Sequence, residues 1–372
     1  MSSLYLHIPF CHHKCVYCGF YSTARYIDRD LYTESLLKEL HTRKDFIDNS
    51  LQTIYFGGGT PSLLSLQQAE KILTGIENVY DLSNVTEITF EINAENADAD
   101  YLKGLKRLGI NRLSIGIESF DDEDLRHLNR SHTSFQAETA IKNAVNAGYE
   151  NISIDLISNL PFSCFEKWKK NLDIFISYNL PHISCYTLMI EQGTMLEKLI
   201  QNKKYFPVSE EYALKEFDYT MNVLKKNGYI HYETSSYAKP GFRSEHNTAY
   251  WTFQPYLGLG AGAHSYNGNI RVWNKEDAEL YMSYYQGETS SKIQSYELLT
   301  SEDRFNEYVM LSARMQNGLD RKYVKKRFPE YYENFSRRCR EMINDGFLNE
   351  DLSLTLKGWH LQDSLILNLC NV

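Results

Sequence analysis

The chain has 372 residues, of which 42% are hydrophobic and 23% charged, and its formal net charge is −9 at pH 7. This composition is typical of a globular protein with one large domain and a smaller one. The acidic balance argues against a nucleic-acid binder, no apolar run reaches the roughly 18 residues of a membrane-spanning helix, and no signal peptide opens the sequence.

Three cysteines stand close together near the start of the chain. Cys11, Cys15 and Cys18 follow an extended apolar stretch. Three thiolates are one fewer than a [4Fe–4S] cluster has irons, so such a cluster keeps one iron open to a ligand from outside the protein. The alternatives are chance clustering of the three cysteines and a zinc site, which usually closes with a fourth Cys or His. His12 and His13 lie nearby, but no second Cys-x-x-Cys follows.

The other four cysteines, out of seven in all, are scattered along the sequence. An odd count with three members packed at one end argues against a framework of disulfides. We therefore expect free thiols and a reducing, cytoplasmic environment.

Short β-rich runs alternate with longer helical patterns over the first two-thirds of the chain. The predicted strands are Ser3–Ile8, Thr53–Gly57, Glu87–Ile92, Arg112–Ile117, Ile152–Ile157 and His182–Leu188. The predicted helices are Asp30–Arg43, Ser65–Val79, Ala99–Leu108, Phe135–Ala147, Phe165–Tyr178 and Ser209–Asn227. Alternation at intervals of roughly 30 residues indicates βαβ units with right-handed crossovers and a parallel sheet.

Six such units, with no Gly-x-Gly-x-x-Gly after the first strand, favour a partial or full (β/α) barrel over a Rossmann fold. The predicted fold class is therefore α/β. In such barrels the chemistry gathers at the carboxyl ends of the strands. The motifs described below fall where predicted strands end, so we expect them to share one site.

The pattern changes near Asn274. Predicted helices cover Ala278–Tyr285, Ser301–Met315, Arg321–Arg327 and Glu330–Asp345, and an alternating, hairpin-like run over Phe347–Leu356 precedes a last helix at Gly358–Leu369. We therefore divide the chain into a core of residues 1–273 and a small winged-helix-like accessory domain of residues 274–372. Such a shape alone does not indicate DNA binding.

Polar and glycine-rich motifs follow several predicted strands. Gly58, Gly59 and Thr60 belong to a glycine run, which permits close approach of the backbone to a ligand. Alone, such a run most often marks a tight turn. Glu91 follows the next strand, and its carboxylate can accept from ribose hydroxyls or an ammonium group, unless it is simply a solvated loop acid. The same alternatives apply to Glu118.

Two further polar residues stand near later strands. Arg130 carries a guanidinium that can pair with a carboxylate in a bidentate fork. Asp155 lies within the otherwise apolar run of a strand, where a carboxylate is costly unless a ligand or partner satisfies it.

At this point a resemblance becomes specific. The run from Tyr5 to Cys11, the glycine motif, the segment Gly109–Phe120 and the segment Gly258–His264 together resemble the coproporphyrinogen dehydrogenase family of the radical S-adenosylmethionine (SAM) superfamily. Within that family, the HemW-type branch of haem chaperones is the more similar. The likeness covers essentially the whole chain.

The resemblance implies a fold, cofactors and site residues. The fold is the radical SAM partial (β/α)6 barrel, and the cluster on the three cysteines presents its open iron to SAM. Positions matching the family's cofactor contacts are Tyr5, Tyr17, Gly58, Gly59, Thr60, Glu91, Glu118, Arg130 and Asp155. At one of them, Glu118, relatives commonly carry Gln, so this chain keeps an acceptor there and loses two donors.

The two branches of the family differ just after the cysteines. The dehydrogenases resemble a pattern with a fourth cysteine two residues beyond the third, where this chain has Phe20. An aromatic ring cannot replace a thiol in redox or proton-transfer chemistry. The haem-chaperone branch carries a His-Asn-x-x-Tyr-Trp element, which is present here from His246 to Trp251.

A neutral histidine is a common axial ligand of haem. His246 is therefore the first candidate haem contact, with a purely structural histidine as the alternative, and His264 is a second candidate. His12 and His13 are weaker ones.

The resemblance thus implies a haem chaperone that binds haem, a [4Fe–4S] cluster and SAM, and passes haem to an apo-haemoprotein. A membrane haemoprotein is one candidate for this acceptor. The alternative function is that of an oxygen-independent coproporphyrinogen III dehydrogenase, which Phe20 disfavours. A radical SAM enzyme that modifies RNA would need a basic appended domain, which the sequence lacks.

Overall fold

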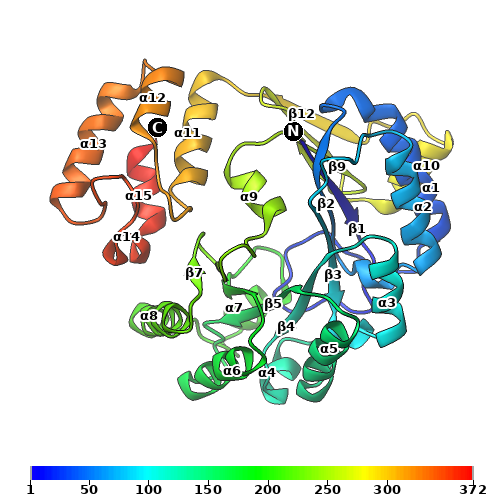
Figure 1. Cartoon of the computed structure of the whole chain (residues 1–372), viewed down its shortest axis with the longest axis horizontal. Coiled ribbons are helices and arrows are strands. Elements are labelled where there is room, and N and C mark those ends of the chain that lie inside the picture. The colour runs from blue at the N-terminus through cyan, green and yellow to red at the C-terminus, as the bar shows by residue number, and fades with distance from the viewer. Residues whose placement is uncertain (1, 371–372) are drawn as a thin grey trace.

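A computed structural model describes residues 2–370. Its centre is one twelve-stranded sheet with the strand order β12-β11-β10-β9-β1-β2-β3-β4-β5-β6-β8-β7. Figure 1 shows helices α1, α2 and α3 on the outer side of the first strands, while α11 to α15 gather at the opposite end of the molecule. None of the helices in the described range is long and apolar enough to cross a membrane.

Strands β1 to β6 form the parallel part of the sheet, as the sequence predicts. These strands are β1 (Ser2–Ile8), β2 (Leu51–Gly58), β3 (Glu87–Asn93), β4 (Arg112–Glu118), β5 (Asn151–Ser158) and β6 (His182–Thr187). The helices that connect them are α1 (Arg29–Arg43), α2 (Leu66–Glu77), α3 (Ala99–Arg107), α4 (Asp122–His127), α5 (Ser134–Asn146) and α6 (Phe165–Tyr178).

Local capping explains where several of these helices begin. Asp28 accepts hydrogen bonds from two backbone N–H groups at the start of α1, and Asp98 does the same for α3. Ser65 and Thr133 form capping boxes at α2 and α5. Such caps satisfy the free N–H groups of a first helical turn. They therefore determine the residue at which each of these helices begins.

The barrel is open, because β1 and β6 do not pair with each other. The other neighbour of β1 is the parallel strand β9 (Tyr256–Leu259), and β6 pairs with the antiparallel β8 (Ser236–Ala238). Beyond these, β10 (His264–Tyr266), β11 (Ile270–Asn274) and β12 (Gln294–Leu298) extend one edge, and β7 (Ile230–His231) ends the other. The predicted partial barrel is confirmed, with edge strands that the sequence did not indicate.

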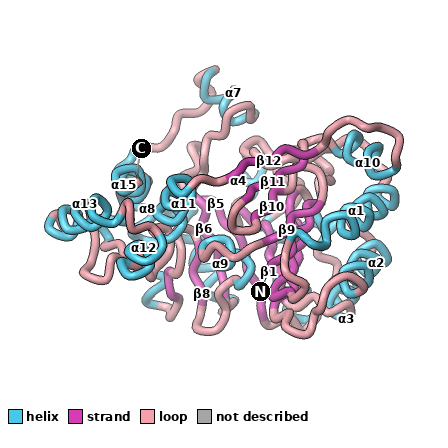
Figure 2. Tube along the Cα trace, turned by 90° about the horizontal axis from the view of Figure 1, so that it is seen from above, coloured by secondary structure: helices cyan, strands magenta, loops and turns pink. Residues whose placement is uncertain are grey.

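Apolar side chains of the sheet and its covering helices build the larger core. On β1, Leu4, Leu6 and Ile8 are at most 1% exposed. Figure 2 shows the strands stacked in the middle of the molecule, with α1, α2 and α3 along one side. Because these strands are covered by helices, they are apolar over most of their length rather than strictly alternating.

A second apolar cluster holds the C-terminal helices together. They are α11 (Ser301–Ser312), α12 (Arg321–Arg327), α13 (Tyr332–Asn344), α14 (Leu356–His360) and α15 (Gln362–Leu369). Phe305, Val309, Val324, Phe335 and Cys339 are among its buried members.

The structure reduces one prediction for this region and contradicts another. The run predicted as a hairpin over Phe347–Leu356 forms one isolated antiparallel bridge, between Leu348 and Leu354, instead of a two-stranded wing. The last helix is two helices, because the side chain of Thr355 caps a first one at Leu356 and the chain breaks again at Leu361.

The two clusters bear on the domain boundary. Helix α10 (Ala278–Gln286) packs its Tyr281 and Met282 into the larger cluster, and β12 pairs with β11. The second cluster begins with Phe305. The predicted division between residues 273 and 274 stays a prediction, and from these contacts we propose that the change of packing lies near residue 300.

Beyond β6, the chain returns to the core through two more helices. Helix α7 (Met195–Gln201) and the longer α8 (Glu210–Lys226) precede β7, and α9 (Glu245–Trp251) precedes β9. Helix α9 lies beside α11 in both views (Figures 1 and 2), so the segment that joins β8 to β9 also meets the C-terminal helices.

Candidate functional site

The three N-terminal cysteines lie on a loop that leaves the end of β1. The backbone N–H of Cys11 donates to Thr23 O (3.0 Å), and that of Val16 donates to Leu128 O (3.2 Å), so the loop is fastened at both sides. The Cys11 Sγ lies 3.3 Å from Thr60 Oγ1, at the end of β2. All three thiols are free and partly exposed.

These thiols open into one cavity of about 570 Å³, which we call the thiol pocket. Most of the predicted site residues line it, namely Cys11, Cys15, Cys18, Tyr17, Gly58, Gly59, Thr60, Glu91, Glu118, Arg130 and Asp155. They come from the cysteine loop, from the carboxyl ends of four parallel strands and from the segment after α4. The structure therefore gathers at one place residues that lie up to 144 positions apart, from Cys11 to Asp155.

The glycine run forms the edge of this pocket next to β1. Gly58 has φ +113°, a conformation that side chains with a Cβ rarely adopt. A Cβ on Gly59 would lie 2.7 Å from Phe10 O and 2.9 Å from the carbonyl carbon of Pro9. Glycine is thus required for the backbone to pass close to the start of the cysteine loop.

A buried ion pair lies against the cysteines. Arg130 Nη1 is 3.7 Å from Glu118 Oε1 and 3.6 Å from Cys15 Sγ, and Arg130 Nη2 donates to Gly116 O (2.8 Å). Glu118 has φ +64° and is 8% exposed. Burial raises the pKa of Glu118 to about 7, although Arg130 acts in the opposite direction. The guanidinium also favours the thiolate form of Cys15, whose pKa burial raises.

Two more carboxyl groups lie on β3 and β5, the strands on either side of β4. Tyr55 Oη donates to Glu91 Oε1 (2.7 Å), and Ser114 Oγ donates to Asp155 Oδ2 (3.3 Å). Burial raises the pKa of Glu91 to about 7 and also raises the pKa of Asp155. Strong shifts of several acids in one cavity are typical of functional sites. Together they give the pocket the capacity to bind a cationic or hydroxyl-bearing ligand.

Tyr5 and His246 are predicted cofactor contacts that lie outside the thiol pocket. Tyr5 lines a second cavity, described below, and its Oη lies 3.2 Å from His7 Nδ1. His246 is fully buried: its Nδ1 lies 2.8 Å from Thr53 Oγ1 and its Nε2 lies 2.9 Å from Tyr250 Oη. Both ring nitrogens already have protein partners, so in this conformation neither is free for iron. A haem contact of His246 stays a prediction, and it requires one of these two hydrogen bonds to break.

The second cavity, of about 490 Å³, lies where β1, β9, β10 and β11 meet α9 and α11, and we call it the aromatic pocket. Its aromatic lining comprises Tyr5, Phe20, Tyr21, Tyr250, Phe253, Tyr256 and Tyr266. Gly19 and Phe20 line both cavities. Phe20 is 71% exposed, so the ring that replaces the fourth cysteine stands at the boundary between them.

Sequence reasoning missed several residues of the thiol pocket. Asn93 Nδ2 donates to Thr60 Oγ1 (3.3 Å), and Asn93 Oδ1 accepts from Arg130 Nη2 (3.4 Å). Ser114 and Tyr186 also line the cavity. Asn93 and Tyr186 stand at or near the carboxyl ends of predicted strands, and that position is the signal that could have identified them.

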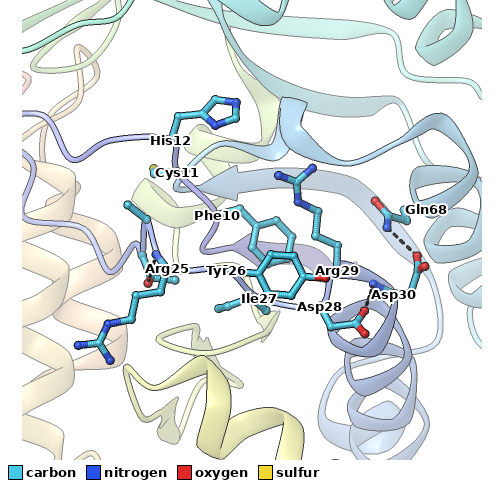
Figure 3. A pocket seen from close by; sticks show the side chains of 12 residues that line it. Phe10, Cys11, His12, Arg25, Tyr26, Ile27, Asp28, Arg29, Asp30 and Gln68 are labelled. Carbon is cyan, nitrogen blue, oxygen red and sulfur yellow. Dashed lines mark hydrogen bonds between the residues drawn. The ribbon is translucent and has the colours of Figure 1, made fainter.

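A third cavity, of about 590 Å³, lies between the start of the cysteine loop and the start of α1 (Figure 3). Of the predicted residues, Cys11 and the weaker haem candidate His12 line it. Arg29 lies over the Phe10 ring and donates from Nη1 to Leu63 O (2.7 Å), and Gln68 donates to Asp30 (2.6 Å). These contacts hold α1 and α2 against the loop, and we assign the cavity no ligand.

Comparisons with known proteins agree with this geometry. A family model described as the radical SAM superfamily matches residues 5–169. A Lactococcus lactis subsp. lactis (strain IL1403) protein named heme chaperone HemW is 35% identical over 371 residues, which cover 98% of this chain and 96% of its own length. The chain belongs to the HemW family of radical SAM proteins. The HemW protein of Bacillus subtilis (strain 168) is 33% identical and covers 89% of this chain and 87% of its own length.

The HemW-family chain also has a relative among solved structures. Coproporphyrinogen III oxidase (HemN) from Escherichia coli, whose structure is described as that of a radical SAM enzyme, aligns with a TM-score of 0.83 at 23% identity. The match covers 99% of this chain and 90% of that one. At this identity the likeness shows the fold, and it confirms the predicted radical SAM architecture.

Membership of the superfamily implies a [4Fe–4S] cluster and SAM. The residues present fit both groups. Three free thiols face one cavity, and none of them is engaged in a disulfide. Within residues 2–370, no group of three His, Cys, Asp or Glu side chains is arranged to hold a single metal ion. The cavity beside the thiols is of the size that small-molecule sites usually have.

Binding of SAM is expected to weaken on acidification. SAM is cationic, and we predict that Glu91, whose pKa burial raises to about 7, attracts it only when the carboxyl group is ionised. Binding of the cation favours loss of the Glu91 carboxyl proton. The dissociation constant of SAM should therefore rise about tenfold when the pH falls from about 8 to about 6. Calorimetry on the anaerobically reconstituted protein measures it. Glu91→Gln should flatten the profile. A profile flattened by Glu118→Gln alone would contradict the assignment to Glu91.

Proposed function

We propose that this chain is a haem chaperone built on a radical SAM scaffold, which binds haem, a [4Fe–4S] cluster and SAM, and passes haem to an apo-haemoprotein. The observation that carries the proposal is Phe20 at the boundary of the thiol and aromatic pockets. The names of the relatives, heme chaperone HemW, support it. All seven cysteines are free thiols, which supports a location in a reducing compartment such as the cytoplasm.

In this proposal the residues of the thiol pocket have a holding role. Cys11, Cys15 and Cys18 would ligate the cluster, and Arg130 offsets the charge of the Cys15 thiolate from 3.6 Å. When bound, the cluster and SAM supply one-electron chemistry and a radical source. Glu91 places a carboxylate for the ammonium or hydroxyl groups of SAM.

The alternative function is oxygen-independent decarboxylation of coproporphyrinogen III. The family's dehydrogenases carry a fourth cysteine at the position of Phe20. In this chain the cysteines that line the thiol pocket are Cys11, Cys15 and Cys18, so the fourth thiol is missing there. Phe20 offers no group for proton transfer or redox chemistry. The proposed acceptor of the haem is an apo-haemoprotein, and a membrane haemoprotein is one candidate for it.

An anaerobic assay with coproporphyrinogen III, SAM and a reductant separates the two functions. We expect no protoporphyrinogen from the wild-type protein, because Phe20 supplies no thiol next to the thiol pocket. The Phe20→Cys variant restores the fourth thiol and shows whether the missing activity depends on that position alone. Robust turnover by the wild-type protein would overturn the proposal in favour of the enzyme.

A further inference from the structure

The aromatic pocket has the volume and the lining of a site for a large aromatic ligand. Its volume of about 490 Å³ lies within the range of small-molecule sites. Aromatic rings reach it from β1, from the cysteine loop and from the α9–β9 segment, and they offer faces and edges for stacking on an extended π system. Nothing in the SAM and cluster assignment uses these side chains apart from Tyr5.

Two histidines line this pocket, and they differ in whether a ring nitrogen is free. His7 is buried, its Nε2 lies 2.8 Å from Tyr21 O, and its Nδ1 lies 3.2 Å from Tyr5 Oη. His264 is exposed, and its ring nitrogens have no hydrogen-bond partner within the described part of the chain. Its ring lies nearly parallel to that of Trp273, with 15° between the planes and 5.9 Å between the centroids.

The charges around the pocket are mixed. Arg271 Nη2 pairs with Glu307 Oε1 at 2.7 Å, and Arg271 Nε is buried without a hydrogen-bond partner. Glu276 also lines the cavity. A carboxylate of a ligand could accept from the Nε of Arg271 while Glu307 keeps its contact with Nη2, so that the guanidinium would have two anionic partners.

We propose that haem binds in the aromatic pocket, with a ring nitrogen of His264 as an axial ligand of the iron and Arg271 facing a propionate. This inference rests on the proposed haem-chaperone function. Neutral imidazole is the form that ligates iron, and partial desolvation of the His264 ring together with the nearby Arg271 charge lowers the pKa of His264. Phe20, which lines both pockets, then lies between the haem and the cluster.

The test is a haem titration followed by optical absorption and electron paramagnetic resonance. Wild-type protein is compared with His264→Gln and with a matched control, His41→Gln, on the exposed outer side of α1. We expect His264→Gln to lose the histidine-ligand signature and to bind haem at least tenfold more weakly, with an unchanged iron content of the cluster. The control should bind as wild type does.

Imidazole rescue keeps the test decisive if the substitution perturbs folding. In His264→Gly, added imidazole should restore the wild-type haem spectrum, which a general loss of structure would not permit. Arg271→Gln should weaken binding of haem more than binding of a porphyrin whose propionates are esterified.

The outcomes separate this inference from the proposed function. If wild-type protein binds no haem, the chaperone proposal itself fails. If wild-type protein binds haem and His264→Gln gives the same spectrum and affinity, the chaperone proposal stands and the His264 site is overturned. The same holds if only a His246 substitution removes the signature.

Discussion

Replacing Cys15 with alanine is expected to abolish assembly of the cluster. Cys15 lines the thiol pocket together with Cys11 and Cys18. With two thiolates left, a cubane cluster has two irons without protein ligands instead of one, so anaerobic reconstitution should leave less than about one iron per chain instead of about four. Iron analysis and the visible absorption of the cluster measure the loss, and SAM affinity should fall with them.

Cys164→Ala is the matched control for this experiment. Cys164 is an exposed free thiol that precedes α6 and lines no part of the thiol pocket. Its removal should leave iron content and SAM affinity unchanged. Normal cluster loading in Cys15→Ala, or an equal loss in Cys164→Ala, would contradict the assignment of the three N-terminal cysteines as ligands.

Removal of Glu87 is expected to have the largest effect on stability. Glu87 and Arg112 are 2% and 1% exposed, with Glu87 Oε2 lying 3.9 Å from Arg112 Nε. Glu87 also accepts hydrogen bonds from the backbone N–H groups of Glu245 (2.9 Å) and His246 (3.1 Å) at the start of α9. Glu87→Ala leaves the Arg112 charge buried without its partner, so the free energy of unfolding should fall by about 3–5 kcal/mol.

Chemical denaturation monitored by circular dichroism measures this change. The control is Asp100→Ala, which removes the exposed ion pair between Lys103 and Asp100 (3.5 Å). Exposed pairs contribute about 1 kcal/mol or less, so the control should differ little from wild type. A loss below about 1 kcal/mol in Glu87→Ala would show that the network at α9 is not a main support of the fold.

The parallel strands and most of the thiol pocket could be predicted from the sequence, because local signals and one topological rule suffice for them. Apolar runs separated by capped helices indicate βαβ units, and parallel strands of one sheet bring their carboxyl ends to one side. Glu91, Asp155 and the glycine run therefore come together without knowledge of any long-range contact.

The surroundings of the single histidines could not be predicted in the same way. His246 lies in a motif that suggests a ligand, but its burial depends on the contacts of α9 with Thr53 and Glu87, which are 193 and 159 positions away. His264 gains its place in the aromatic pocket because β9 pairs with β1, and no local pattern reveals that pairing.

The hairpin-like run, which forms one antiparallel bridge and no regular strands, shows a limit of prediction from hydrophobic periodicity. Alternating apolar residues over Phe347–Leu356 match a strand pattern, yet Leu348, Leu352 and Leu354 are buried in the C-terminal helical cluster. Short apolar runs do not distinguish a strand from a turn packed on helices. Thr355 caps the N-terminus of α14, so the last residue of the run, Leu356, is the first residue of that helix.

The central claim is that this radical SAM scaffold carries haem, and one measurement tests it most directly. Purified, cluster-reconstituted protein is titrated with haem under anaerobic conditions while the Soret band is recorded. We expect saturable binding of one haem per chain at micromolar haem, with the cluster intact. No saturable change in the Soret band at micromolar haem would contradict it.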